Sequence, residues 1–110
     1  MKIAYFVTRN TTNELFNGCL LNTLAGGTHH VQVTVMHFAE DAVYHLVQGS
    51  KTAEKIQKAA KRDGFSVLAC ECSVGNRGLD GKLIPEVTIA HIPDFYRLAE
   101  EKNTDHLVVL

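Results

Sequence analysis

The feature that most constrains this chain is a regular alternation of short apolar runs with longer segments of helical spacing. The runs that predict strands are Lys2–Thr8, Val31–Phe38, Phe65–Ala69, Val87–Ala90 and His106–Leu110. Apolar runs of this length, rich in β-branched residues, are typical of strands in a parallel sheet that is covered on both faces. The alternation therefore predicts an α/β fold.

The segments between these runs predict the helices. They are a first helix from Thr11 or Thr12 to Ala25, a second over Ser50–Arg62 and a third over Pro93–Lys102. The segment Ala39–Ser50 is either one helical turn or a structured loop. Strands that alternate with helices are joined by right-handed crossovers. We therefore predict a flavodoxin-like three-layer sandwich with a mainly parallel five-stranded sheet in a flavodoxin-like strand order.

Length and composition favour one globular domain over residues 1–110. A chain of 110 residues has the length of a single domain, and 45% hydrophobic with 21% charged residues is enough to build a core. A net charge of −1 produces no field that would attract nucleic acid or an anionic membrane. The first apolar run ends by Val7, too short for a signal sequence or a membrane span. We expect a cytoplasmic protein with no nucleic-acid partner and no membrane partner.

Three cysteines, Cys19, Cys70 and Cys72, carry the most reactive side chains. An odd number without an export signal favours free thiols. Cys19 falls on the apolar face of the first predicted helix and is expected in the core. Cys70 ends the third predicted strand, and ligands bind beyond the carboxyl ends of the strands in an open parallel sheet. Cys70 is therefore the candidate catalytic residue, and the alternative is a small buried hydrophobe.

Polar residues after Cys70 would surround this thiol. The candidate supporting residues in that segment are Cys72, Ser73, Asn76, Arg77 and Gly78. Backbone N–H groups after the strand and the guanidinium of Arg77 would stabilise a thiolate. Cys72 would resolve a persulfide only if the turn brings the two sulfurs together.

Two histidines near the end of the second predicted strand are further candidates. His37 and His45 would line the same cleft as Cys70, where an imidazole can take the proton of a thiol. A metal site built from Cys70, Cys72 and one histidine is an alternative, although structural zinc sites usually have two ligand pairs at wider spacing. We expect no metal and no cofactor.

The segment after the first strand disfavours a nucleotide site. VTRNTTNELF has no G-x-G-x-x-G and no Walker-type glycine loop. Its threonine-rich part, TRNTTN, would at most approximate the phosphate loop of flavodoxins, where hydroxyls and amides hold an anion.

The stretch CECSVGNRGL, from Cys70 to Leu79, resembles a segment of the DsrE/TusD-type (DsrE/DsrF-like) sulfur-relay family. In that segment a cysteine ends the third strand and an Arg-Gly pair follows. The ending EVTIAHIPDFYRLAEEKNTDHLVVL is similar to the family's ending, and KIAYFVT and VMHFAEDAVYHL fit the same layout. The resemblance implies a flavodoxin-like fold, homotrimers or hexamers, and a cysteine that carries sulfur as a persulfide. Cys70 corresponds to the acceptor cysteine and Arg77-Gly78 to the Arg-Gly pair, whereas Cys72 and the histidines lie outside the pattern.

The leading hypothesis is a small sulfur carrier, similar to sulfurtransferases, that accepts sulfane sulfur on Cys70. Its partners would be sulfur donor and acceptor proteins. One alternative is a non-catalytic oligomeric module of the same fold that binds a ligand or a protein. Another is a redox or metal-binding protein that uses Cys70 and Cys72 together. Self-association is also expected because a small sheet with few covering helices leaves apolar surface to bury.

Overall fold

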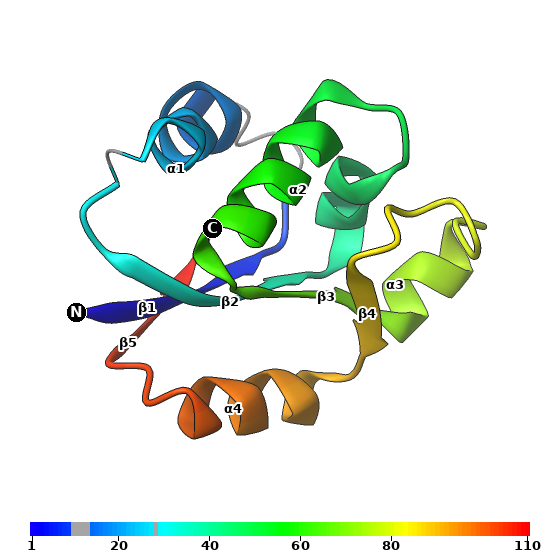
Figure 1. Cartoon of the computed structure of the whole chain (residues 1–110). Coiled ribbons are helices and arrows are strands. Elements are labelled where there is room, and N and C mark those ends of the chain that lie inside the picture. The colour runs from blue at the N-terminus through cyan, green and yellow to red at the C-terminus, as the bar shows by residue number, and fades with distance from the viewer. Residues whose placement is uncertain (10–13, 28) are drawn as a thin grey trace.

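The computed structural model describes residues 1–9, 14–27 and 29–110 and contains one sheet of five parallel strands (Figure 1). The strands are β1 (Lys2–Val7), β2 (Gln32–Phe38), β3 (Ser66–Cys70), β4 (Val87–Ala90) and β5 (His106–Val109). They lie in the order β4-β3-β2-β1-β5, and each neighbouring pair is parallel. The predicted α/β class with a five-stranded parallel sheet is confirmed.

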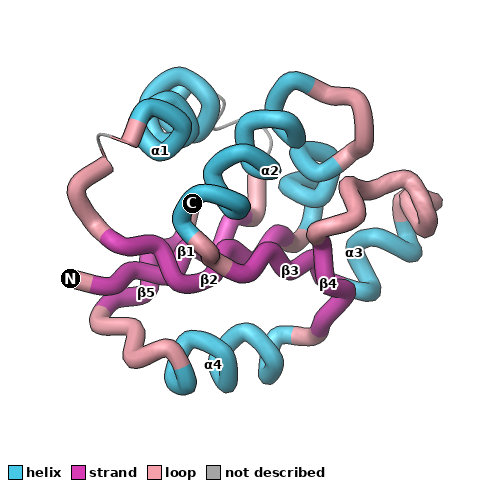
Figure 2. Tube along the Cα trace, in the orientation of Figure 1, coloured by secondary structure: helices cyan, strands magenta, loops and turns pink. Residues whose placement is uncertain are grey.

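Helices cover both faces of this sheet. They are η1 (Glu14–Leu20, a π-helix), α1 (Leu21–Gly26), η2 (Glu40–Leu46, a 3₁₀-helix), α2 (Lys51–Asp63), α3 (Glu71–Asn76) and α4 (Ile92–Glu101). Figures 1 and 2 show α1 and α2 on one side of the sheet and α4 on the other. We call these sides the α1/α2 face and the α4 face. The arrangement is the predicted three-layer sandwich.

The strand order differs from the predicted flavodoxin order, which is 2-1-3-4-5. Here the first three connections each move one strand along the sheet, from β1 to β4. The fourth connection, through α4, returns across the sheet to the far side of β1, where β5 pairs in parallel. Right-handed crossovers in opposite directions place their helices on opposite faces. The return crossover therefore accounts for the position of α4.

Local sequence signals place most elements well. The Ser50 side chain accepts a hydrogen bond from the Ala53 N–H at 3.1 Å and so caps α2 as predicted. The α2 helix ends at Asp63 and is capped by Gly64, whose φ of 74° suits a residue without a side chain. The undecided segment after β2 forms η2. The prediction missed α3 because its sequence, ECSVGN, contains few strong helix formers.

The first predicted helix is wound differently from an α-helix over part of its length. In the described residues it begins as the π-helix η1 and becomes regular only at Leu21. A π-helix has more residues per turn, so the 3.6-residue spacing assigns its faces wrongly. Cys19 is exposed, and the prediction that it lies in the core is wrong.

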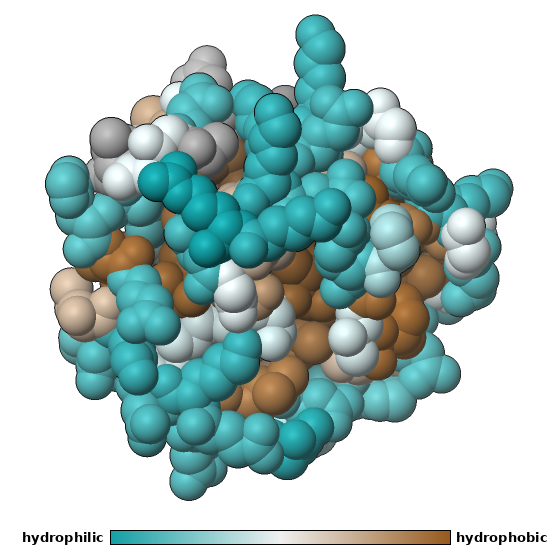
Figure 3. All heavy atoms as spheres, in the orientation of Figure 1, coloured by the Kyte–Doolittle hydropathy of each residue, from teal (hydrophilic) through white to brown (hydrophobic). Residues whose placement is uncertain are grey.

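The two faces of the sheet differ in the size of their cores. The larger cluster lies against α1, α2 and η2 and includes Phe16, Phe38 and Ile56. The cluster on the α4 face is smaller, and its buried members are Ala4, Val35, Leu68, Ala90, Phe95 and Ala99. Apolar side chains also reach the surface between α2 and α4 (Figure 3). Among the described residues, no helix has the length and apolar character needed to cross a bilayer.

Candidate functional site

Cys70 lies where the third strand ends and α3 begins. It pairs in register with Ala90 of β4, and its side chain is partly exposed. Side chains alternate along a strand, so Cys70 lies on the same face as Leu68, which belongs to the cluster under α4. Cys70 is therefore a reachable thiol at the carboxyl edge of the sheet rather than a fully buried hydrophobe.

A carboxylate and an imidazole meet directly after Cys70 and Ala90. Glu71 and His91 are brought together by the strand register, and Glu71 Oε2 lies 2.7 Å from His91 Nε2. The backbone N–H of His91 donates to Asp94 Oδ2 at 2.9 Å, which fixes the start of α4. Cys72 is exposed in the first turn of α3. His91 was not among the predicted site residues, and its position directly after the fourth predicted strand was the signal that could have found it.

Arg77 contacts the segment after β2. Its Nη2 lies 3.0 Å from Asp41 Oδ1 and 3.5 Å from Glu40 Oε2, and its Nη1 donates to the carbonyl of Ser73 at 3.2 Å. The predicted role of this guanidinium was to stabilise a Cys70 thiolate. In the structure its charge is engaged with two carboxylates, and Arg77 joins α3 to η2.

Ser73 also contacts the segment after β2, from a buried position in α3. It is buried, and its Oγ accepts a hydrogen bond from the Glu40 N–H at 2.8 Å. Glu40 has a φ of 52°, the left-handed region that a residue with a side chain rarely adopts. The bond to Ser73 and the ion pair to Arg77 together fix this strained start of η2. The other two supporting candidates are at the end of α3, where Asn76 is exposed and Gly78 turns the chain with a φ of 65°.

His37 is fully buried beneath α4. Its ring stacks on Phe6 at 4.9 Å between centroids and contacts Phe95 at 5.5 Å. Neither ring nitrogen has a hydrogen-bond partner among the described residues. Burial lowers the pKa of His37 to about 4, a shift that the charge of Asp94 opposes. His37 shares the α4 face with Cys70, but it packs between aromatic rings instead of lining an open cleft.

His45 lies on the opposite side of the sheet, in η2. Its ring contacts Phe16 and Phe38, and its Nε2 is 3.3 Å from the carbonyl oxygen of Arg9. Burial lowers the pKa of His45, and the bond to that carbonyl opposes the shift. The structure therefore separates His37 and His45 by the sheet, and the cleft that these two rings were predicted to share with Cys70 is not formed.

The metal and anion sites weighed from the sequence gain no support. In the described ranges, no three His, Cys, Asp or Glu side chains gather in a group that could hold a metal ion. The threonine-rich TRNTTN segment was a weak candidate for an anion loop, and its residues 10–13 lie outside the described residues.

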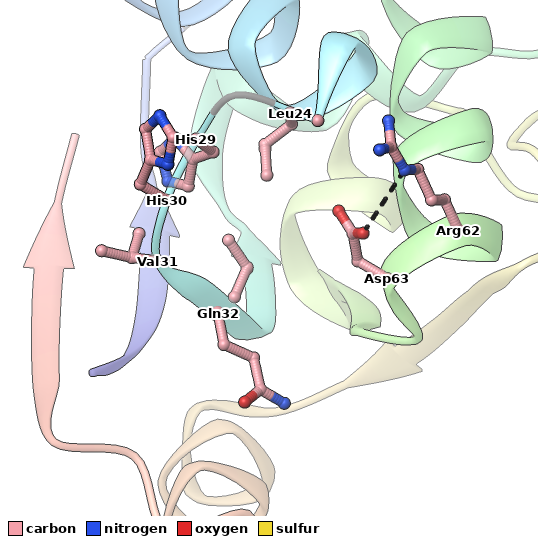
Figure 4. Close-up of a pocket in the computed structure, with 9 residues that line it drawn as sticks. Leu24, His29, His30, Val31, Gln32, Arg62 and Asp63 are labelled. Carbon is pink, nitrogen blue, oxygen red and sulfur yellow. Dashed lines mark ion pairs between the residues drawn. The ribbon is translucent and has the colours of Figure 1, made fainter.

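A cavity of about 340 Å³ lies away from the thiol, beside the first residue of β2 (Figure 4). Its wall includes His29, His30 and Gln32 on one side and Arg62 and Asp63 on the other, with Arg62 Nε 4.0 Å from Asp63 Oδ1. This is the amino end of the strand, whereas ligands of open parallel sheets bind at the carboxyl ends. We therefore place the candidate site at Cys70.

Comparison with known proteins supports the fold alone. No family model matches the chain, and no curated protein matches it in sequence. Among solved structures, the YchN protein of E. coli superposes with a TM-score of 0.73 and 18% identity, covering 100% of this chain and 99% of that chain. MTH1491 from Methanobacterium thermoautotrophicum superposes with a TM-score of 0.72 and 12% identity, and the match covers 99% of this chain and 98% of MTH1491. BT1422 from Bacteroides thetaiotaomicron superposes with a TM-score of 0.66 and 13% identity, and the match covers 99% of this chain and 94% of BT1422.

The class that fold and site define is thus a small α/β domain with a thiol at the carboxyl edge of its sheet. The coverage of these neighbours is nearly complete in both directions, so the whole chain shares their architecture. MTH1491 and BT1422 are both described as proteins of unknown function. At 12–18% identity, the likeness carries no function to this chain.

Proposed function

We propose that this protein is a cytoplasmic sulfur carrier of the DsrE/TusD type, in which Cys70 holds sulfane sulfur as a persulfide. The observation that carries the proposal is the position of Cys70 at the carboxyl end of β3, partly exposed. A thiol that must meet two partner proteins in turn has to be reachable, and a fully buried cysteine would be inert.

The transfer needs two displacement steps and no cofactor. The Cys70 thiolate attacks the outer sulfur of a donor persulfide, and a new S–S bond forms on Cys70. The S–S bond of the donor breaks, and its electron pair leaves on the donor sulfur as a thiolate. An acceptor thiolate then attacks the outer sulfur of the Cys70 persulfide, which releases Cys70 as a thiolate. The transferred sulfur keeps its oxidation state, so neither step requires an oxidant or a reductant.

The surroundings of Cys70 suit this exchange. Cys70 is followed by Glu71, whose Oε2 lies 2.7 Å from Nε2 of His91. This contact engages the carboxylate that is nearest in sequence to the thiol. Arg77 and Ser73 fix the neighbouring segment, which would keep the edge of the sheet beside the thiol in one conformation.

Intact-mass spectrometry tests the proposal. The chain is incubated with glutathione persulfide in a Cys19→Ser, Cys72→Ser background, which removes the two exposed thiols. We expect a gain of one sulfur, about 32 Da, that a reductant reverses. The same background with Cys70→Ser should gain nothing.

The two remaining thiols provide the controls. Restoring Cys72 alone shows whether it shortens the lifetime of the Cys70 persulfide by forming a disulfide, as the redox alternative requires. A Cys70 that stays unmodified while Cys19 or Cys72 takes up sulfur in the native chain would contradict the proposal. That result would favour a non-catalytic binding module.

A further inference from the structure

Lys102 directly follows α4, and its side chain reaches β2 and β3 near their amino ends. Its Nζ donates a hydrogen bond to Ser66 Oγ at 2.7 Å and another to the carbonyl oxygen of Thr34 at 3.1 Å. The pairing of β1 with β2 skips Thr34, and a residue skipped in this way leaves a backbone group without a partner in the ladder. Lys102 provides the donor that the Thr34 carbonyl needs. The side chain therefore holds the end of α4 against the sheet.

The two acceptors of Lys102 suit a neutral amine. Both are uncharged groups, and no carboxylate forms an ion pair with Lys102 among the residues that the structure describes. An amine has two N–H groups and one lone pair, so two acceptors use all of its donors and leave the lone pair free. An ammonium has a third donor, which neither Ser66 nor Thr34 uses.

Helix α4 and burial act in opposite directions on the charge of Lys102. The last carbonyl groups of α4 favour a cation at this position. The side chain is half-buried, however, and burial lowers the pKa of Lys102 below its ordinary value. A neutral lysine is a nucleophile, whereas an ammonium is not. The amine of Lys102 is therefore expected to react faster with electrophiles than the amine of an exposed lysine.

A cavity of about 270 Å³ gives access to this side chain. The polar residues in its wall are Lys2, Gln32, Thr34, Asp63, Lys102 and Asn103. Among the described residues of the wall, Asp63 carries the one carboxylate, and its Oδ1 lies 4.0 Å from Arg62 Nε. The ammonium of Lys2 forms no ion pair within the described ranges. The cavity thus places an amine and an uncompensated cation in the same wall.

We propose that Lys102 is a modification site, at which a small acyl phosphate transfers its acyl group to Nζ. The phosphate would lie beside the ammonium of Lys2 and the side-chain amides of Gln32 and Asn103, which can all donate hydrogen bonds to its oxygens. The cavity volume is just under the roughly 300 Å³ at which pockets for drug-sized ligands begin, so it suits a small ligand. The proposal is independent of the chemistry assigned to Cys70.

The reaction forms one bond and breaks one. The lone pair of the Lys102 amine attacks the carbonyl carbon of the acyl phosphate, and a C–N bond forms. The C–O bond to the phosphate breaks, and its electron pair leaves on the phosphate oxygen. The nitrogen loses a proton to water, so the products are an amide and inorganic phosphate, and no oxidant or reductant is needed. The acylated Nζ has no charge and a single N–H for two acceptors, so Lys102 loses one of its hydrogen bonds to the sheet.

Incubation of the native chain with acetyl phosphate, followed by peptide mapping with mass spectrometry, tests the proposal. At about pH 8 we expect Lys102 to be acetylated at least about fivefold faster than Lys58. Lys58 is the matched control, because it is an exposed lysine of α2 that does not line the cavity. Hydrogen exchange over Ile92–Glu101 should become faster in chains acetylated at Lys102, since α4 has then lost one of its bonds to the sheet.

Lys2→Gln separates the reactivity of the amine from the binding of phosphate. With acetyl phosphate, this variant should acetylate Lys102 at least about threefold more slowly than the native chain does. With the N-hydroxysuccinimide ester of acetic acid, which has no phosphate, the two chains should acetylate Lys102 at nearly equal rates, because burial alone lowers the pKa of Lys102. A Lys102 that reacts no faster than Lys58 with either reagent would overturn the proposal. A preference for Lys102 that appears with the ester alone would overturn the assignment of a phosphate to the cavity.

Discussion

Replacing His37 by leucine should remove about 2.5 kcal/mol of the stability that the fold loses between pH 7.5 and 4.5. His37 is fully buried between Phe6 and Phe95, and both ring nitrogens lack partners among the described residues. Its pKa is lowered to about 4 in the folded chain, from an ordinary value of 6.5. Leucine has nearly the same volume, so it keeps the packing while removing the titrating group.

The direction in which the free energy of unfolding changes with pH depends on whether the folded or the unfolded chain binds the proton. Above pH 6.5 the imidazole is neutral in both states and contributes no pH dependence. As the pH falls below 6.5, the unfolded chain takes up a proton that the folded chain refuses, so the free energy of unfolding decreases until about pH 4. At pH 4.5 the loss from this one residue is about 2.5 kcal/mol. For a small domain this is a large share of the total stability.

Urea unfolding at a series of pH values measures the effect. The free energy of unfolding of the native chain, minus that of His37→Leu, should fall by about 2.5 kcal/mol from pH 7.5 to 4.5. The exposed His106, changed to glutamine, is the control and should follow the native curve. The difference also cancels the contribution of His45, which both chains retain. A difference that stays constant within about 0.5 kcal/mol would refute the reasoning.

The segment after β2 gives two further predictions. Ser73→Ala leaves the N–H of Glu40 without its acceptor and should cost about 1–2 kcal/mol of unfolding free energy, with faster hydrogen exchange over residues 40–46. Unchanged exchange there would show that Ser73 does not hold η2. Arg77→Gln should cost about 1 kcal/mol, since this half-buried side chain joins two elements and bonds to Asp41. Arg97→Gln, whose pairs are exposed and lie within one helix, should stay within about 0.5 kcal/mol, and equal losses would contradict this expectation.

Patterns that depend on neighbours in sequence predicted much of the fold. The Ser50 cap sets the start of α2, and apolar runs of strand length predicted five strands, with Val87–Ala90 matching its observed bounds. Each of these signals is local. The strand order was not predictable from them, because the choice between two edges for the last strand depends on contacts between residues about one hundred positions apart, such as Ile3 and His106.

The candidate site was predicted only in part, because some of its features depend on local sequence and others on contacts between distant segments. Cys70 could be placed because it ends an apolar run, and that position requires no knowledge of the partner strands. The contacts of Arg77 could not be predicted, because Asp41 and Glu40 lie in a segment whose conformation was undecided from the sequence. His37 follows Val33 and Val35 in an alternating strand, but alternation does not say whether the face it points to is a cleft or lies under a helix.

The pairing of β5 with β1 also has a consequence for the order of assembly of the sheet. Ile3 meets Val33 across a loop of about thirty residues, whereas it meets His106 only after a loop of about one hundred. Closing the longer loop costs about 1 kcal/mol more in chain entropy. Within the sheet of described strands, the β5 edge of β1 gains its partner when His106–Val109 is made, while β1, β2, β3 and β4 can add in sequence order. The four-residue strand β5 thus joins the described sheet after the other four, and the growing chain must keep that edge of β1 from other partners until then.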